Sequence, residues 1–198
     1  MRFIIYRNSN ICRYSVQKTS KNDGGMDMKL ELLRANSEME EQYYDFINDW
    51  QKNDEAIVPY AARLFDMDYK TWLDYTYKIE NKDTCPPNLV PAHTYFLTQE
   101  NKRIIGAINI RHCLNDYLFN FGGHIGYGIR PSERKKGYAS LMLSMALPIA
   151  KEFGIDKILI TCDKNNVSSA KTMINNGGVL ENEVLDDTEI TQRYWIEA

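Results

Sequence analysis

The chain has 198 residues, of which 43% are hydrophobic, 12% aromatic and 26% charged, a composition typical of one globular domain with a packed core. Its formal net charge of −3 and isoelectric point near 5.7 argue against a nucleic-acid partner, because general nucleic-acid binding needs a basic face. No apolar run approaches the ~20 residues that span a bilayer, so we expect no membrane partner either.

The four cysteines predict free thiols rather than a metal site. Cys12, Cys85, Cys113 and Cys162 are far apart, with no C-x-x-C spacing and no histidine at ligand spacing. Scattered thiols suit a reducing compartment, so we expect a cytoplasmic protein without structural zinc or another metal. Cys162 has no sequence neighbour that would lower its pKa, which favours a core thiol over a nucleophile.

The first 27 residues differ from the rest of the chain. They are polar, lack sustained periodicity and end near the glycine pair Gly24 and Gly25. We therefore predict a flexible N-terminal extension over residues 1–27 and one domain over residues 28–198.

The first half of that domain is predicted to combine helices with an antiparallel meander. Leu30 and Leu32 indicate a strand, and Ser37 with Glu40 forms a capping box before a helix. A second, aromatic-rich helix is predicted over residues 69–80, followed by a proline-rich loop over 85–91. Three strand-like runs follow, at residues 93–99, 103–111 and 123–130, the first two joined by a hairpin turn.

The second half alternates between helices and strands. Helices are predicted over residues 138–153 and after Asn165 or Asn166, and strands over 155–162, 179–184 and 190–196. Pro148 lies inside the first of these helices and predicts a bend near Ser144. This order after an antiparallel meander predicts a mixed α/β (α+β) fold.

The most informative segment is the basic turn between the strand that ends near Ile129 and the following helix. Arg134, Lys135 and Lys136 lie in the turn, Gly137 ends it, and Tyr138 and Ala139 begin the helix. A helix start exposes N–H donors and the positive end of its dipole, which together attract a pyrophosphate. A glycine allows close approach of the backbone. The alternative is a solvated basic turn.

This turn fits the pattern Arg or Gln, two residues, Gly, one residue, Gly or Ala. It resembles the acetyl-CoA signature of the GNAT N-acetyltransferase superfamily, and the chain resembles an uncharacterised predicted-acetyltransferase branch of it over about residues 29–197. The resemblance implies a single GNAT-like domain, with a mostly antiparallel sheet whose central strands splay apart between flanking helices.

The resemblance also implies how acetyl-CoA is held. The backbone at Ile129 would pair with the pantetheine arm, and the amides of residues 134–139, including Tyr138 and Ala139, would hold the pyrophosphate. Arg134, Lys135 and Lys136 would line this site, and Asn166 would lie near the thiol end.

The proton-transfer residues are less clearly indicated. His124 stands where many relatives have a glutamate, so it is the candidate base, and the alternative is a histidine hydrogen-bonded at a strand end. The tyrosine that donates a proton in many relatives falls at Met173, which cannot donate. Tyr194 is the substitute acid, against the alternative of a packed aromatic. Arg111 is expected to bind an acceptor carboxylate or to form a surface ion pair.

The sequence therefore predicts an acetyl-CoA-dependent enzyme that acetylates a primary amine of a small molecule or peptide. Two rival functions stay open, a non-catalytic acyl-CoA-binding module and a nucleic-acid-binding regulator. A homodimer also stays open, and the sequence does not identify the acceptor.

Overall fold

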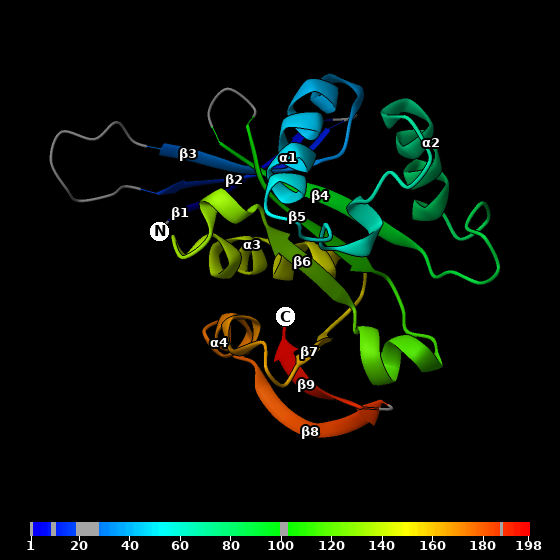
Figure 1. Ribbon diagram of the computed structural model, residues 1–198, viewed down its shortest axis with the longest axis vertical. Coiled ribbons are helices and arrows are strands. Elements are labelled where there is room, and N and C mark those ends of the chain that lie inside the picture. Colours follow the sequence, from blue (N-terminus) through cyan, green and yellow to red (C-terminus); the bar gives the residue numbers. More distant parts are fainter. Residues whose placement is uncertain (1, 9–10, 19–27, 100–102, 187) are drawn as a thin grey trace, which may run out of the picture.

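The computed structural model describes residues 2–8, 11–18, 28–99, 103–186 and 188–198. The strands are β1 (Arg2–Asn8), β2 (Ile11–Lys18), β3 (Met28–Arg34), β4 (Ala92–Gln99), β5 (Ile104–Arg111), β6 (Ile125–Ile129), β7 (Lys157–Asp163), β8 (Val179–Asp186) and β9 (Glu189–Glu197). The α-helices are α1 (Glu40–Lys52), α2 (Tyr69–Glu80), α3 (Tyr138–Glu152) and α4 (Val167–Ile174). Figure 1 shows helices on both faces of the larger sheet.

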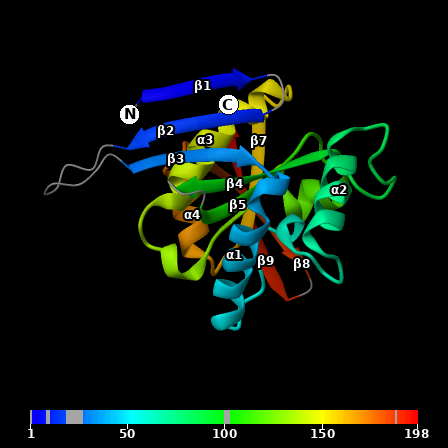
Figure 2. The same ribbon diagram turned by 90° about the horizontal axis from the view of Figure 1, so that it is seen from above.

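The strands form two sheets. In the described chain the larger sheet has the order β1-β2-β3-β4-β5-β6, with antiparallel neighbours throughout, and the smaller sheet has the order β7-β9-β8. Seen from above, β1 to β5 lie side by side in sequence order (Figure 2). The predicted mixed fold and the antiparallel meander are confirmed.

The two sheets meet at one end of β6 and then separate. His124, directly before β6, donates its backbone N–H to the Leu159 carbonyl on β7 at 2.7 Å. Beyond this point β6 pairs with β5 alone among the described strands, whereas β7 pairs with β9. The splayed central strands that the sequence resemblance implied are therefore present.

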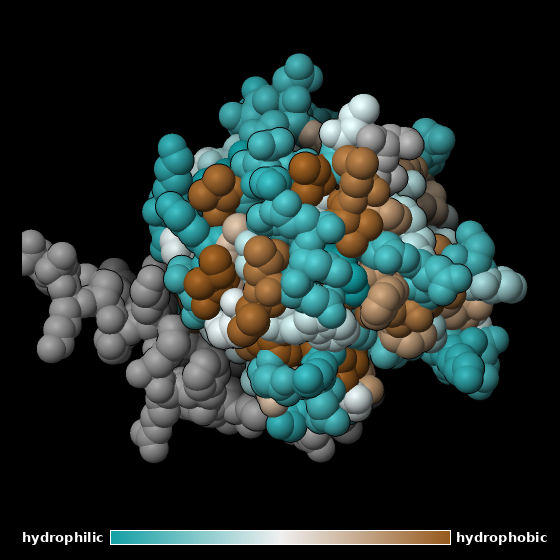
Figure 3. Space-filling model, turned by 90° about the horizontal axis from the view of Figure 1, so that it is seen from below, coloured by the Kyte–Doolittle hydropathy of each residue, from teal (hydrophilic) through white to brown (hydrophobic). Residues whose placement is uncertain are grey.

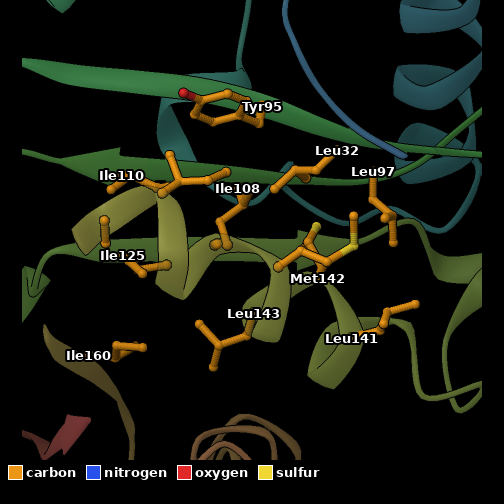
Figure 4. Close-up of a cluster of buried hydrophobic side chains, with 14 of the residues drawn as sticks. Leu32, Tyr95, Leu97, Ile108, Ile110, Ile125, Leu141, Met142, Leu143 and Ile160 are labelled. Carbon is orange, nitrogen blue, oxygen red and sulfur yellow. The ribbon is translucent and has the colours of Figure 1, made fainter. Parts of the chain in front are cut away.

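Helix α3 fills one face of the larger sheet. Figure 4 shows its Leu141 and Leu143 below the side chains of Ile108 and Ile125 on β5 and β6, and its Met142 beside Ile108. All five are at most 5% exposed, so this contact is the main apolar core. The helix runs on through Pro148, which has no N–H to donate to the Ser144 carbonyl; the expected bend there stays a prediction.

Helices α1 and α2 cover the opposite face with an aromatic cluster. Tyr43 on α1 stacks on Trp72 of α2, with ring centroids 5.0 Å apart, and both contact Phe96 on β4. The apolar residues Tyr43, Phe46, Ile47 and Trp50 of α1 are buried. The predicted capping box at Ser37 is wrong. Asn36 caps the helical segment instead, because its side chain accepts a hydrogen bond from the Glu38 N–H.

The N-terminal region contributes strands that the sequence did not predict. Strands β1 and β2 form a hairpin, and β2 pairs with β3. The expectation for residues 1–27 was a flexible extension, whereas the described part of this range extends the larger sheet. Residues 1, 9–10 and 19–27 lie outside the described residues, and the domain boundary at residue 28 stays a prediction.

One face of the molecule carries exposed apolar side chains. Apolar side chains gather over α4 and β8 (Figure 3), where Val167, Ile174, Val179 and Leu185 are each more than half exposed. A homodimer stays a prediction. None of the helices in the described ranges is long and apolar enough to cross a membrane.

Candidate active site

The basic turn between β6 and α3, hereafter the α3 turn (residues 131–137), is open at its end. Gly137 has φ of +81°, a left-handed conformation that favours glycine, and a Cβ built on it would meet no atom within 4 Å. The first turn of α3 begins at Tyr138 and Ala139, and the N–H groups of a first helical turn point out of the helix end. These N–H groups beside open space suit the pyrophosphate of acetyl-CoA, which the sequence placed here.

The side chain of Arg134 is engaged elsewhere. Its two terminal nitrogens donate to the Glu55 carboxylate at 2.8 and 2.6 Å, its Nε donates to the Ile129 carbonyl at 3.2 Å, and its guanidinium lies 5.0 Å from the Trp50 ring centroid. Arg134 therefore fastens the α3 turn to the end of α1. The suggested side-chain contact with the cofactor is not supported by this geometry, although the Arg134 backbone stays in the turn.

Lys135 is the exposed cation of the α3 turn that the structure leaves unpaired. Lys136 donates to the Glu133 carboxylate at 2.8 Å, and this neighbour also binds Arg103. Lys135 forms no ion pair within the described ranges and has φ of +64°. Of the three basic side chains in the turn, Lys135 is the one best placed to meet a phosphate.

The free edge of β6 can accept an added strand. Ile129 pairs with Gly106 on β5, and β6 is the last strand of its sheet in the described structure. Across the gap, the Tyr127 hydroxyl lies 2.8 Å from the Ser169 hydroxyl on α4. A pantetheine arm carries amide groups that pair with such an edge, as a peptide does in β-augmentation.

Asn166 is the N-cap of α4. Its side-chain oxygen accepts from the Ser169 N–H at 3.0 Å, which confirms the capping role that the sequence left open between Asn165 and Asn166. Its expected position near the cofactor thiol stays a prediction. Met173, where a proton-donating tyrosine was expected, is fully buried in the main core.

The geometry argues against His124 as the general base. The His124 Nδ1 accepts a hydrogen bond from the Leu159 N–H at 3.0 Å, so the nitrogen that would take up a proton faces a donor. Burial, aided by the nearby Arg111, lowers the pKa of His124 to about 4. The imidazole is neutral at pH 7 and joins the two sheets, which is the strand-end role that the sequence gave as the alternative.

Tyr194 lies in the core of the smaller sheet. It is 4% exposed, and its hydroxyl donates to the Gln192 side chain at 2.9 Å. Burial, with Cys162 and Glu183 nearby, raises its pKa. This environment favours the packed-aromatic alternative over the proposed acid. The thiol of Cys162 is also buried, which raises its pKa to about 11 and leaves it protonated.

A cavity of about 750 Å³ lies on the α2 side of the larger sheet and is hereafter called the acceptor cavity, after the role proposed for it below. Its walls come from residues 60–67, α2, the loop before β4, the ends of β4 and β5, and the loop before β6. The lining residues are Tyr60, Ala61, Arg63, Phe65, Met67, Trp72, Tyr75, Thr76, Ile79, Asn88, Leu89, Val90, Ala92, Thr94, Asn109, Arg111, Asn115, Tyr117, Leu118 and Gly122.

Arg111 lies against β6 in this cavity. Its Nη1 donates to the carbonyl oxygens of Gly122 and Gly123 at 2.8 and 2.9 Å, and its Nη2 is 3.5 Å from where a Cβ on Gly126 would stand. Burial lowers its pKa. Arg111 therefore holds the loop before β6 and faces the cavity, and it forms no ion pair among the described residues.

The glycines of β6 make room for a chain segment. A Cβ on Gly128 would lie 2.3 Å from the Val58 carbonyl oxygen, and one on Gly126 would lie 3.4 Å from Pro59. Ile125 and Tyr127 pack on the opposite, α3 side, so the residues of β6 alternate between its two faces. The face of β6 that carries these two glycines is partly covered by residues 58–59. Sequence reasoning missed this segment, although paired glycines on one strand face indicate close packing of some kind.

Two aromatic side chains of α2 line the cavity. Trp72 and Tyr75 do so, and Trp72 is also part of the aromatic cluster between α1 and α2. Tyr69 is 1% exposed in that cluster, and its hydroxyl donates to the Asn36 carbonyl. Sequence reasoning missed Arg63, because nothing in the local pattern distinguishes it from an ordinary surface arginine.

No group of three or more possible metal ligands occurs in the part of the chain that the structure describes.

The sequence matches the family described as the acetyltransferase (GNAT) domain over residues 29–179. No curated protein sequence matches the chain.

Several solved structures share the fold. The ribosomal-protein-S5-alanine acetyltransferase of Vibrio fischeri superposes with a TM-score of 0.62 at 16% identity, over 85% of this chain and 92% of that one. RimL, a ribosomal L7/L12 alpha-N-protein acetyltransferase in complex with coenzyme A, gives 0.62 at 14% identity, over 85% and 93%. The spermidine/spermine N-acetyltransferase SpeG of Vibrio cholerae, in mutant form, gives 0.56 at 16% identity, over 85% and 93%.

The family match spans most of the chain, and the splayed sheets and the α3 turn agree with it. The chain therefore belongs to the GNAT family and is an N-acetyltransferase.

Proposed function

We propose that the protein transfers the acetyl group of acetyl-CoA directly to a primary amine of a small-molecule or peptide acceptor bound in the acceptor cavity. The observation that carries this proposal is the position of the α3 turn. Its open glycine, Gly137, lies at the start of α3 directly after β6, whose far edge is free. Arg111 and Gly126 place the cavity against the same strand.

The chain's own residues would divide the work of binding. The N–H groups at the start of α3 and the Lys135 ammonium would hold the pyrophosphate, and the β6 edge beyond His124 would hold the pantetheine arm. The thioester of acetyl-CoA supplies the acetyl group when bound. The acceptor nitrogen then forms the amide bond, the carbon–sulfur bond breaks, the amine loses a proton and the thiolate gains one.

The cavity favours the neutral amine that this reaction needs. Apolar walls disfavour a charged ammonium, and the guanidinium groups of Arg63 and Arg111 repel it. Both effects lower the pKa of a bound amine, so loss of the proton to water suffices without a dedicated basic side chain. This role of the cavity replaces the base expected at His124, which is already hydrogen-bonded through Nδ1.

The proposal is tested by binding and turnover together. Calorimetry with acetyl-CoA measures binding, and a thiol assay with mass spectrometry measures acetylation across a panel of primary amines. Release of one coenzyme A thiol for each acetylated amine supports the proposal. Tight acetyl-CoA binding without turnover of any amine would favour the acyl-CoA-binding module instead.

The nucleic-acid-binding alternative is not favoured by the charges of the α3 turn. Arg134 pairs with Glu55 and Lys136 pairs with Glu133, which leaves Lys135 as the single unpaired cation of the turn among the described residues. A clamp for nucleic acid needs several unpaired cations in a row. Salt-dependent binding of DNA or RNA by the purified protein would revive this alternative.

A further inference from the structure

The charged residues of the acceptor cavity are all of one sign. Arg63 and Arg111 line it, and none of its described lining residues is Asp or Glu. The remaining walls are apolar, aromatic or neutral and polar. A cation entering this cavity would therefore meet two guanidinium groups and no carboxylate, whereas an anion would meet complementary charge.

These two arginines differ from the other arginines whose side chains the structure describes. Each of the others pairs with a carboxylate: Arg34 with Glu80, Arg103 with Glu133, Arg130 with Asp45 and Asp49, Arg134 with Glu55, and Arg193 with Glu181. In the described chain Arg63 and Arg111 have no carboxylate partner. The fold thus neutralises its arginines by pairing except in this cavity.

The protein uses part of the hydrogen-bonding capacity of each guanidinium. The Nη1 of Arg111 donates to the carbonyl oxygens of Gly122 and Gly123. The Nε of Arg63 donates to the Ile57 carbonyl at 2.7 Å, and the Arg63 guanidinium lies 5.1 Å from the Tyr60 ring centroid. A guanidinium carries five N–H donors. The Nη2 of Arg111 and the terminal nitrogens of Arg63 have no acceptor among the described protein atoms, so each side chain is anchored with donors to spare.

Burial adds to the need for a partner at Arg111. Removal of this cation from water lowers its pKa, so the charged form is destabilised in the protein as it stands. An anion bound beside Arg111 would stabilise its charged form and would accept hydrogen bonds from its remaining N–H groups. A carboxylate suits a guanidinium best, because its two oxygens match the spacing of the paired N–H groups.

We propose that the acetyl acceptor is an amine that also carries a carboxylate, bound by Arg111 and Arg63, and an apolar or aromatic group that contacts Trp72, Met67 and Leu89. That the acceptor is an amine rests on the proposed function. That it carries a carboxylate rests on the cavity alone. Polyamines are disfavoured as acceptors, because they bring further positive charge to a cavity without an acidic side chain.

The first test measures binding without catalysis. Phenylacetate and phenylacetamide share a ring and differ in charge. Calorimetry measures their binding, supported by the tryptophan fluorescence, to which Trp72 in the cavity wall contributes. We expect phenylacetate to bind at least about tenfold more tightly than phenylacetamide. Equal affinities would overturn the proposal, whether or not the protein acetylates any amine.

Variants of the two arginines test whether these side chains cause the preference for phenylacetate. Arg111→Gln and Arg63→Gln should each reduce the preference for phenylacetate, and Arg63→Gln serves as the second variant because Arg111 also holds the loop before β6. Lys70→Gln removes one positive charge from an exposed position on α2 outside the cavity and should leave the preference unchanged. An unchanged preference in both arginine variants would overturn the assignment.

The second test uses turnover. L-phenylalanine should be acetylated with a kcat/KM at least about tenfold above that of L-phenylalaninamide, and spermidine should be the poorest of the three. The difference should appear mainly in KM, because the carboxylate contact is made equally in the ground and transition states. Preferred acetylation of spermidine would overturn this inference while supporting the proposed transferase. Tighter binding of the carboxylate ligand without turnover of any amine would support the carboxylate site and would contradict the proposed transferase.

Discussion

The α3 turn and the acceptor cavity differ in how they would recognise their ligands. In the turn, two of the three basic side chains are neutralised by carboxylates, and what faces open space is the backbone at Gly137 and the start of α3. In the cavity, two arginine side chains without carboxylate partners face the open volume. Backbone recognition suits a cofactor shared across a family, and side-chain recognition suits an acceptor that differs between members.

The largest expected effect tests the backbone role of the α3 turn. Gly137→Glu places a negative charge and side-chain bulk where the phosphate would lie, so acetyl-CoA affinity should fall by roughly 100-fold or more, measured by calorimetry.

Gly154→Glu is the matched control for Gly137→Glu. Gly154 ends the same helix with φ of +82° and has no atom within 4 Å of a built Cβ, so the variant has the same backbone strain and the same added charge. The control should bind acetyl-CoA as the wild type does. Equal affinity of both folded variants would move the phosphate site away from the turn.

The next prediction concerns His124, at the junction of the two sheets. His124→Ala leaves the Leu159 N–H buried without an acceptor and should lower the free energy of unfolding by about 1–3 kcal/mol. His124→Asn places an oxygen near the Nδ1 position and should recover most of this loss. We expect kcat/KM of both variants to stay within about threefold of the wild type. A roughly hundredfold loss in both would restore His124 as the base.

The pH dependence of stability tests the structural role of His124 independently of activity. The pKa of His124 falls from 6.5 to about 4 on folding, so between these values the unfolded state binds more protons and stability decreases as the pH falls. His124→Asn should remove up to about 1.4 kcal/mol per pH unit of this slope. His93, whose pKa burial lowers to about 3, contributes equally to both proteins, so urea unfolding at pH 5 to 7 isolates the His124 contribution.

A smaller effect distinguishes the cations of the α3 turn. Lys135→Gln should weaken acetyl-CoA binding by about two- to fivefold, as expected for an exposed ion pair with a phosphate. The double variant Arg134→Gln/Glu55→Gln removes a neutral pair and preserves the net charge, so its affinity should match the wild type. A larger loss in the double variant than in Lys135→Gln would show that Arg134 itself contacts the cofactor.

The smallest effect is expected at Cys162, on β7 opposite the free edge of β6. Its buried thiol, with a pKa raised to about 11, is protonated at neutral pH and is a poor nucleophile. Cys162→Ala should keep kcat/KM within about twofold and lower stability by about 1 kcal/mol. An acetylated Cys162 found by mass spectrometry during turnover would contradict direct transfer.

The sequence by itself determined the features that depend on local chain properties. The period of the apolar residues located α1, α2 and α3, and the glycine and basic residues after β6 located the α3 turn. Even Asn166 was recognisable as a cap, because its side chain bonds to a backbone group three residues on. Such interactions join residues that are close in the chain, so the local sequence is sufficient to predict them.

Tertiary structure decided which side chains have partners, and this governs their chemistry. Arg134 meets Glu55 across 79 residues, and the His124 imidazole meets the Leu159 N–H across 35 residues, so neither has the free side chain that its sequence context indicated. Arg63 and Arg111 line the same cavity, which no local sequence signal indicates. Charge pairing and burial depend on distances in space, and the order of residues along the chain does not contain those distances.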